Sequence, residues 1–262
     1  MGKFTYCENP FVKNLMIRKV SAAYQIDLSD ALEPDIAAYR SFNEFFTRPL
    51  KPEARPIASS AGSIASPADG FLSQKGPIQK GSIVQAKGFD YSVDDLLGGD
   101  TERAKPFLGG SFATIYLSPR DYHRLHMPLK GTLKEMIHVP GRLFSVNDAT
   151  TRNVPGLFAR NERVVAIFDT EAGPMALILV GAIFVASIET VWHGVVTPPT
   201  QSGVQSFSYD KGTIVLEKGA EMGRFNMGST IIALFGTPNV AFDDQMTLGS
   251  AVRMGLSIGH IG

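Results

Sequence analysis

The sequence has little cysteine and no long hydrophobic run. Its single thiol, Cys7, excludes an internal disulfide and any zinc site built from several cysteines. The longest apolar stretch, from Met175 to Ile188, is too short to span a bilayer and is expected to form buried strands. Residues 1–10 lack the apolar segment of a cleavable signal peptide. The sequence therefore favours a cytosolic protein without a transmembrane anchor of its own.

An excess of charge of either sign is also absent, because 25 Lys and Arg balance 25 Asp and Glu. Such a balance gives no overall field that would favour nucleic acid as a partner. What the chain does contain is 26 Gly and 16 Pro, spread between many short apolar runs. This pattern is typical of a turn-rich, mostly β protein.

The N-terminal part has helical character from residue 10 to residue 47. Apolar and basic residues recur there near helical spacing: Phe11, Lys13, Leu15, Met16, Arg18 and Lys19. A second helix is expected to start near Ser41 and to stop before Pro49. The first helix either packs its apolar face on the core or lies as a basic amphipathic segment on an anionic membrane surface.

Strand patterns alternate with turn clusters from about residue 64 onward. Residues 111–117 suit a strand, and residues 163–168 and 175–179 flank a turn, which predicts a hairpin. Ser92 is expected to cap a short helix.

Together these patterns predict an α+β fold with a mostly antiparallel β-sheet body and N-terminal helices. They divide the chain into an N-terminal helical region, residues 1–55, which is the candidate for membrane association, and a β-rich domain, residues 56–262.

Gly228-Ser229-Thr230 is the first candidate for chemistry, because it lies between two segments expected to be strands. A serine that follows glycine can face a carbonyl with no side chain in the way. The hydroxyl reacts only if a histidine takes its proton and an acid orients that histidine. Without such partners the tripeptide is simply a turn.

Asp69, His123 and His126 are the candidates for those partners. The two histidines lie in residues 116–128, where no Cys or acidic motif supplies the further ligands of a zinc site, so no metal is expected. In an extended strand their side chains would point to opposite faces. Asp69 precedes Gly70, and most Asp-Gly pairs are turn chemistry alone.

Read in order, a series of segments closely resembles the bacterial membrane-associated phosphatidylserine decarboxylases. The resemblance extends from about Phe11 to Leu256. The segments are residues 66–70, 86–88, 116–128, 144–147, 157–163, 188–192, 223–225 and 227–230.

Members of that family are proenzymes that cut themselves before the serine of a Leu-Gly-Ser-Thr motif. Met227-Gly228-Ser229-Thr230 matches it, with Met in place of Leu, a change that nearly conserves volume. The resemblance implies a β chain, residues 1–228, and an α chain, residues 229–262, headed by a covalent pyruvoyl group derived from Ser229. It also implies that His126 is the base of self-cleavage and that Asp69 orients it.

The resemblance further implies that phosphatidylserine is decarboxylated to phosphatidylethanolamine and CO2. The lipid amine would form a Schiff base with the pyruvoyl carbonyl, which serves as electron sink. His123 is the candidate for proton donation or substrate recognition. The implied setting is the cytoplasmic face of the bacterial inner membrane, with a homodimer of β–α heterodimers.

Two other functions stay open on the residues alone. One is a serine hydrolase that uses Ser229, His126 and Asp69, although Ser229 lacks a Gly-x-Ser-x-Gly elbow. The other is a non-catalytic peripheral lipid-binding protein. If the chain binds a phospholipid, as decarboxylase or as lipid-binding protein, Lys87, Arg120 and Arg124 are candidate partners for the lipid phosphate.

Overall fold

The computed structural model describes residues 5–262 except 87, 184–186, 200, 227–229 and 237–239. Its helical elements are α2 (Pro10–Tyr24), α3 (Phe42–Phe46), η1 (Pro52–Ala54), α4 (Val93–Leu96), α5 (Thr101–Ala104), η2 (Lys105–Phe107), α6 (Asp148–Thr151) and α7 (Leu157–Arg160). Its strands are β1 (Ser63–Ala65), β2 (Gly70–Pro77), β3 (Ser82–Ala86), β4 (Phe89–Ser92), β5 (Ser111–Tyr116), β6 (Arg124–His126), β7 (Gly131–Val139), β8 (Arg163–Thr170), β9 (Gly173–Val180), β10 (Ile188–Thr190), β11 (Gly194–Val195), β12 (Gln205–Ser208), β13 (Val215–Leu216), β14 (Glu221–Phe225), β15 (Thr230–Phe235), β16 (Val240–Phe242), β17 (Ala251–Val252) and β18 (Ser257–Ile261).

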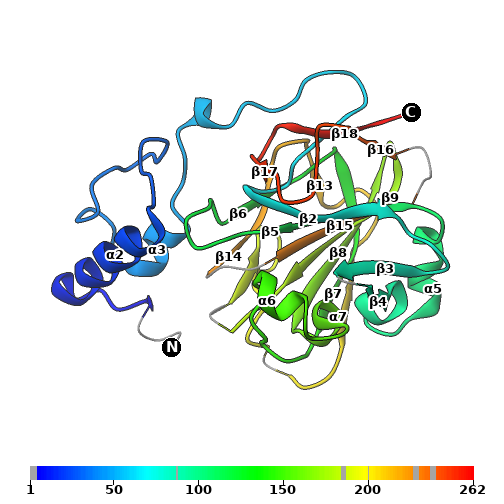
Figure 1. Ribbon diagram of the computed structural model, residues 1–262, viewed down its shortest axis with the longest axis horizontal. Coiled ribbons are helices and arrows are strands. Elements are labelled where there is room, and N and C mark those ends of the chain that lie inside the picture. The colour runs from blue at the N-terminus through cyan, green and yellow to red at the C-terminus, as the bar shows by residue number, and fades with distance from the viewer. Residues whose placement is uncertain (1–4, 87, 184–186, 200, 227–229, 237–239) are drawn as a thin grey trace.

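A nine-stranded antiparallel sheet forms the body (Figure 1). Its strands follow the order β12-β7-β8-β9-β15-β5-β2-β17, and β13 also pairs with β7. Strands β8 and β9 form the expected hairpin, paired from Arg163 opposite Val180 to Thr170 opposite Gly173. The α+β prediction, with a mostly antiparallel body and N-terminal helices, is confirmed.

Both faces of this sheet are buried, which explains why its central strands are apolar throughout. In β15, Ile231, Ala233 and Phe235 belong to one hydrophobic cluster, whereas Ile232 and Leu234 belong to another. Successive side chains of a strand point to opposite faces, so a sheet covered on both sides needs apolar residues at every position.

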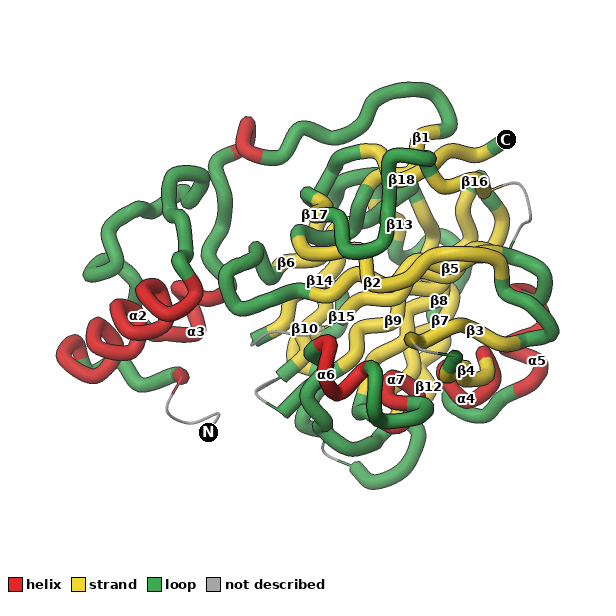
Figure 2. Tube along the Cα trace, in the orientation of Figure 1, coloured by secondary structure: helices red, strands yellow, loops and turns green. Residues whose placement is uncertain are grey.

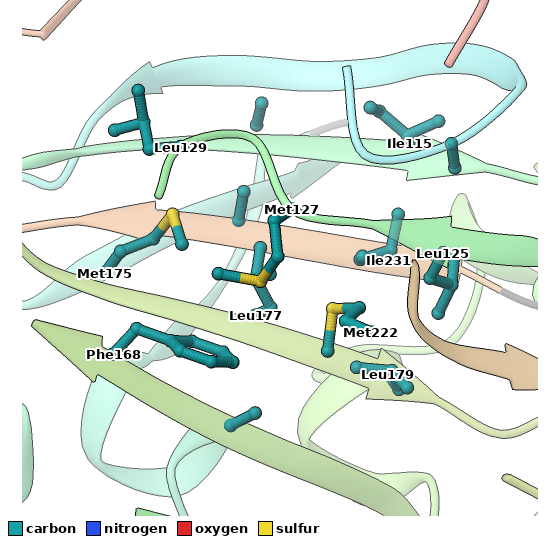
Figure 3. Packing of buried hydrophobic residues seen from close by; sticks show 14 of the residues in the cluster. Ile115, Leu125, Met127, Leu129, Phe168, Met175, Leu177, Leu179, Met222 and Ile231 are labelled. Atoms are coloured by element: carbon teal, nitrogen blue, oxygen red, sulfur yellow. The ribbon is translucent and has the colours of Figure 1, made fainter. Parts of the chain in front are cut away.

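The first of these clusters lies between the large sheet and a four-stranded sheet of order β11-β10-β14-β6. Figure 3 shows Leu177 and Ile231 of the large sheet facing Leu125, Met127 and Met222. The smaller sheet contains the histidine segment, so this packing fixes where the histidines lie. Short helices, including α4 and α7, cover the opposite face of the large sheet.

The N-terminal helices form a separate lobe beside the β6 and β14 end of the body (Figures 1 and 2). Its core contains Ile17 of α2 and the three phenylalanines of α3. Ser41 caps α3 by accepting the N–H of Glu44, as its sequence predicts.

Helix does not continue between α2 and α3, so the expectation of helical character through residue 47 is wrong for residues 25–41. The Asp27 carboxylate there accepts the N–H of Ser29, and the Asp35 carboxylate accepts the N–H of Ala37. These local hydrogen bonds stabilise turns in competition with helix. None of the helices in the described part of the chain has the length and apolarity needed to cross a membrane.

Candidate functional site

The predicted cleavage segment, Met227-Gly228-Ser229, lies outside the described residues. The structure does place the residue on each side of it. Asn226 follows β14, and Thr230 begins β15 opposite Tyr116 and Val180. Both flanking residues are buried.

His123 lies just before β6, and its side chain is completely buried. Its Nδ1 is 2.7 Å from the carbonyl oxygen of Asp121, and a carbonyl can only accept, so Nδ1 bears the proton. Nε2 therefore presents a lone pair, and it has no hydrogen-bond partner among the described residues. Burial lowers the pKa of His123 to about 3. His123 is thus a neutral imidazole with a free accepting nitrogen.

His126 is the last residue of β6 and has a different environment. Its Nδ1 lies 2.8 Å from the carbonyl oxygen of Gly219, which assigns the proton to Nδ1. Its Nε2 lies 3.1 Å from the hydroxyl of Tyr122 and accepts that hydrogen bond. Burial lowers the pKa of His126 below its usual value, and the Gly219 carbonyl opposes this in part. The imidazole is therefore oriented with Nε2 as its basic atom.

Asp69 does not hydrogen-bond to His126 in the structure. Its carboxylate is bound by Arg55, with Nη2 2.6 Å from Oδ2 and Nε 2.9 Å from Oδ1, and Oδ1 also accepts the N–H of Met254. The Asp69 turn is nevertheless next to His126, whose N–H donates to the carbonyl of Pro67. The predicted role of Asp69 as orienter thus stays a prediction, and Gly219 occupies the Nδ1 side of the ring.

Steric crowding explains why the residue after Asp69 is a glycine. Gly70 has a φ of 153°, and a Cβ there would lie 2.3 Å from the carbonyl oxygen of Tyr116. Only glycine therefore lets β2 approach β5 closely enough at this point. That approach places Asp69 against the body.

A cavity of about 310 Å³ lies between the N-terminal lobe and the body. Its wall is mostly apolar and comes from α2, α3, β5 with the residues that follow it, and two further loops: Val20, Tyr24, Phe42, Phe46, Tyr116, Leu117, Pro119, Ser145, Val146, Asn147, Ala182 and Ile183. Phe46 also packs on His123, with ring centroids 4.0 Å apart. The same side chain thus lines the cavity and contacts the buried histidine.

Buried Asn161 joins the two loops of this cavity. Its Oδ1 accepts the N–H of Phe144, and its Nδ2 donates to the carbonyls of Phe144 and Gly181. Asn161 belongs to a segment that carries the family resemblance, but its bonding partners could not be read from the sequence.

The three cationic residues predicted as partners for a lipid phosphate have different environments. Arg124 is already engaged, because Nη1 pairs with Glu221 at 2.9 Å and Nε donates to the carbonyl of Thr47. Arg120 is half-exposed, lies over the ring of Phe71 and lines a different cavity, together with Asp69. Lys87 lies outside the described residues.

Sequence reasoning missed Tyr122 and Gly219 as the partners of His126. Tyr122 could have been found, since it lies in the histidine segment and phenols commonly hydrogen-bond to buried imidazoles. Gly219 acts through its backbone carbonyl, which no side-chain pattern reveals.

Comparison with known proteins identifies the family. The phosphatidylserine decarboxylase family model matches residues 42–260, starting at the first residue of α3. A phosphatidylserine decarboxylase proenzyme of Bordetella pertussis is 59% identical over 258 residues, which are 97% of this chain and 86% of that protein. Proteins of the same name from Pseudomonas fluorescens and Pseudomonas aeruginosa are 58% and 59% identical, over 98% and 95% of this chain and 90% and 87% of theirs. The chain therefore belongs to the phosphatidylserine decarboxylase family.

Proposed function

We propose that this chain is a phosphatidylserine decarboxylase proenzyme that cuts itself between Gly228 and Ser229 and then forms phosphatidylethanolamine and CO2. One observation carries this proposal beyond family membership. His123 is buried and His126 partly buried, both rings carry their proton on Nδ1 and present Nε2 as the accepting atom, and the segment that holds them pairs with β14, which leads into the cleavage segment. Two neutral imidazoles in one segment suit two separate reactions, self-cleavage and decarboxylation, each of which needs a proton transfer.

Self-cleavage needs a base that takes the hydroxyl proton of Ser229, and His126 is our candidate. The oxygen adds to the Gly228 carbonyl, and collapse with breakage of the C–N bond gives an ester. Loss of the Ser229 Cα proton and breakage of the Cβ–O bond then release the Gly228 carboxylate. Hydrolysis of the resulting enamine consumes water, releases ammonia and leaves a pyruvoyl group on residue 229.

The residues around the cleavage segment fit such a group. Thr230 Oγ1 and His123 Nε2 are buried and lack partners among the described residues, so a donor and an acceptor are free there. When present, the pyruvoyl carbonyl supplies the electron sink for decarboxylation.

His123 would act on the lipid amine in this scheme. Its Nε2 can accept a proton in the resting state but cannot donate one. We propose that its Nε2 accepts a hydrogen bond from the amine of the serine head group, and that the proton held in this hydrogen bond is the one later passed to the substrate carbon. This single residue would then serve both recognition and proton donation.

The lipid would reach the site through the cavity between the N-terminal lobe and the body. Its apolar wall suits the lipid, and Phe46 connects it to His123. The exposed face of α2 carries Phe11, Leu15, Arg18 and Lys19, a combination that binds anionic membrane surfaces. We propose a peripheral position on the cytoplasmic face of the inner membrane and pairing of two β–α heterodimers, as the resemblance implies.

The intact mass of freshly purified protein tests the proposal. We expect two chains, residues 1–228 and 229–262, the smaller being lighter by one ammonia than a peptide that begins with serine. Ser229→Ala should remain one full-length chain. A full-length wild-type chain whose Ser229 reacts with a fluorophosphonate would instead indicate a serine hydrolase.

A further inference from the structure

Helix α3 makes direct contacts with the parts of the body that hold the candidate site. Phe46 packs on His123, and the carbonyl of Thr47, its C-cap, accepts Nε of Arg124. Asn43 makes a third contact, since its Nδ2 donates to Oδ1 of Asn226 at 3.1 Å. The helix therefore touches both the histidine strand and the end of β14.

Asn226 is the last described residue before the cleavage segment, and it is held from two sides. Its Nδ2 donates to Oγ of Ser187 at 2.5 Å, and its backbone N–H donates to the carbonyl of Ser187 at 2.9 Å. Asn43 completes the series on the other side of the amide. All three residues are buried, where hydrogen bonds between polar groups are strong and loss of one partner is costly.

The other end of the cleavage segment is fixed independently. Thr230 lies in the centre of the large sheet, paired with Tyr116 on one side and Val180 on the other. The residues on the two sides of the segment are thus placed by a β-ladder, at Thr230, and by the Asn43–Asn226–Ser187 series, at Asn226. Attack of a hydroxyl on the preceding carbonyl depends steeply on geometry, so displacement of one end would slow it.

Asn43 also has a hydrogen-bond acceptor, Oδ1, that is not used by the described residues. Its Oδ1 is buried and lacks a hydrogen-bond partner among the described residues. Buried polar atoms without partners are rare in folded proteins and call for an explanation. Asn43 Oδ1 is therefore available, beside Asn226, to a donor outside the described residues.

We infer that Asn43 is a positioning residue for self-cleavage, acting through Asn226 on the segment that is cut. This inference rests on the proposed self-cleavage at Gly228-Ser229. It means that α3 takes part in maturation of the body and is more than a docking element.

Self-cleavage kinetics of the full-length chain test the inference. Cleavage would be followed on denaturing gels after synthesis, at a temperature where circular dichroism shows every variant folded. Asn43→Ala should slow cleavage about tenfold, the effect of losing one buried hydrogen bond, and Asn226→Ala should slow it at least as much, because it loses the hydrogen bonds to both Asn43 and Ser187. The double variant should be no slower than the slower single variant, because both changes break the same series.

Two further variants separate positioning from general destabilisation. Asn43→Asp should restore cleavage to near the wild-type rate, since the Asn226 amide can rotate to donate to the new carboxylate. Gln85→Ala removes a buried amide that bonds to the carbonyl of Thr151 and to the N–H of Leu157, so it should lower thermal stability but not the cleavage rate.

The outcomes are distinct. Wild-type chain that never cleaves would overturn the proposed function itself. Wild-type chain that cleaves, together with Asn43→Ala at the same rate, would overturn the role of Asn43. Equal slowing by Gln85→Ala, or additive effects in the double variant, would also overturn it.

Discussion

Two histidines only three positions apart have unlike environments, and this difference decides their chemistry. The ring of His123 packs on Phe46, and its Nε2 has no hydrogen-bond partner among the described residues. Nε2 of His126 accepts a hydrogen bond from the Tyr122 hydroxyl. The two rings contact different aromatic side chains, Phe46 for His123 and Tyr122 for His126. Each histidine can therefore serve one of two reactions without interfering with the other.

Alanine substitutions should separate the two reactions. His126→Ala should remain uncut, because it lacks the imidazole proposed to take the proton of the Ser229 hydroxyl. His123→Ala should still cleave but should lose decarboxylation by at least about a hundredfold, the usual worth of a general acid–base group. The measurements are intact mass and release of CO2 from phosphatidylserine in mixed micelles. Exposed His260 offers the control, and unchanged turnover in His123→Ala would contradict its role.

The pH dependence of self-cleavage should reflect the buried state of His126. The neutral form can take a proton, and the protonated form cannot. Burial lowers the pKa of His126 from its usual 6.5, so the base is lost only as the pH falls through that lower value. The cleavage rate should stay level from about pH 8 to pH 6.5 and decline at more acid pH. A decline that begins above pH 7 would argue against His126 as base.

Among the elements, α2 shows how a correct helix prediction can leave its orientation open. The spacing of residues from Phe11 onward predicts a helix, and α2 is confirmed. Yet Phe11 is 79% exposed and Leu15 44% exposed, whereas Lys13 is buried with Nζ 2.8 Å from the carbonyl of Ala37. The structure therefore packs α2 through Ile17 and leaves Phe11 and Leu15 exposed, and membrane binding through that exposed face stays a prediction.

Membrane binding through α2 gives a prediction at the scale of the element. The double variant Phe11→Ala/Leu15→Ala should bind vesicles of phosphatidylglycerol and phosphatidylethanolamine at least about tenfold more weakly, because it loses apolar area that would enter the bilayer. Sedimentation with vesicles measures this. Leu108→Ala, at a comparably exposed site after η2, should bind like wild type, and self-cleavage should persist in both variants.

At the scale of the whole molecule, the predicted cut separates two chains that share one sheet. Residues 229–262 contain β15, which pairs along its whole length with β5 and with β9. They also contain β17 and β18, which pair with β2 and β1. Every described side chain of β15 is buried, so the smaller chain is part of the core.

We therefore expect the cleaved chains to stay together. They should elute as one species in gel filtration and separate only in denaturant, because separation would expose the apolar faces of β15. Light scattering on the same column reports whether heterodimers pair. Separation of the chains in plain buffer would contradict the placement of β15.

The sequence by itself determined the elements and the chemistry-bearing residues. Alternation and turn residues predicted β5 and the β8–β9 hairpin, and Ser41 and Ser92 marked helix starts, because these features depend on local preferences. The resemblance supplied Asp69, His123, His126 and the Gly228-Ser229 bond as candidates.

Only the tertiary structure decided which groups meet. The Asn43–Asn226 hydrogen bond joins residues far apart in the chain, and the Gly219 carbonyl on His126 is backbone, so neither leaves a local pattern. Arg55 on Asp69 likewise follows from how the N-terminal lobe packs on the body. Such contacts depend on packing of distant segments around a common core, and periodicity along the chain carries no record of them.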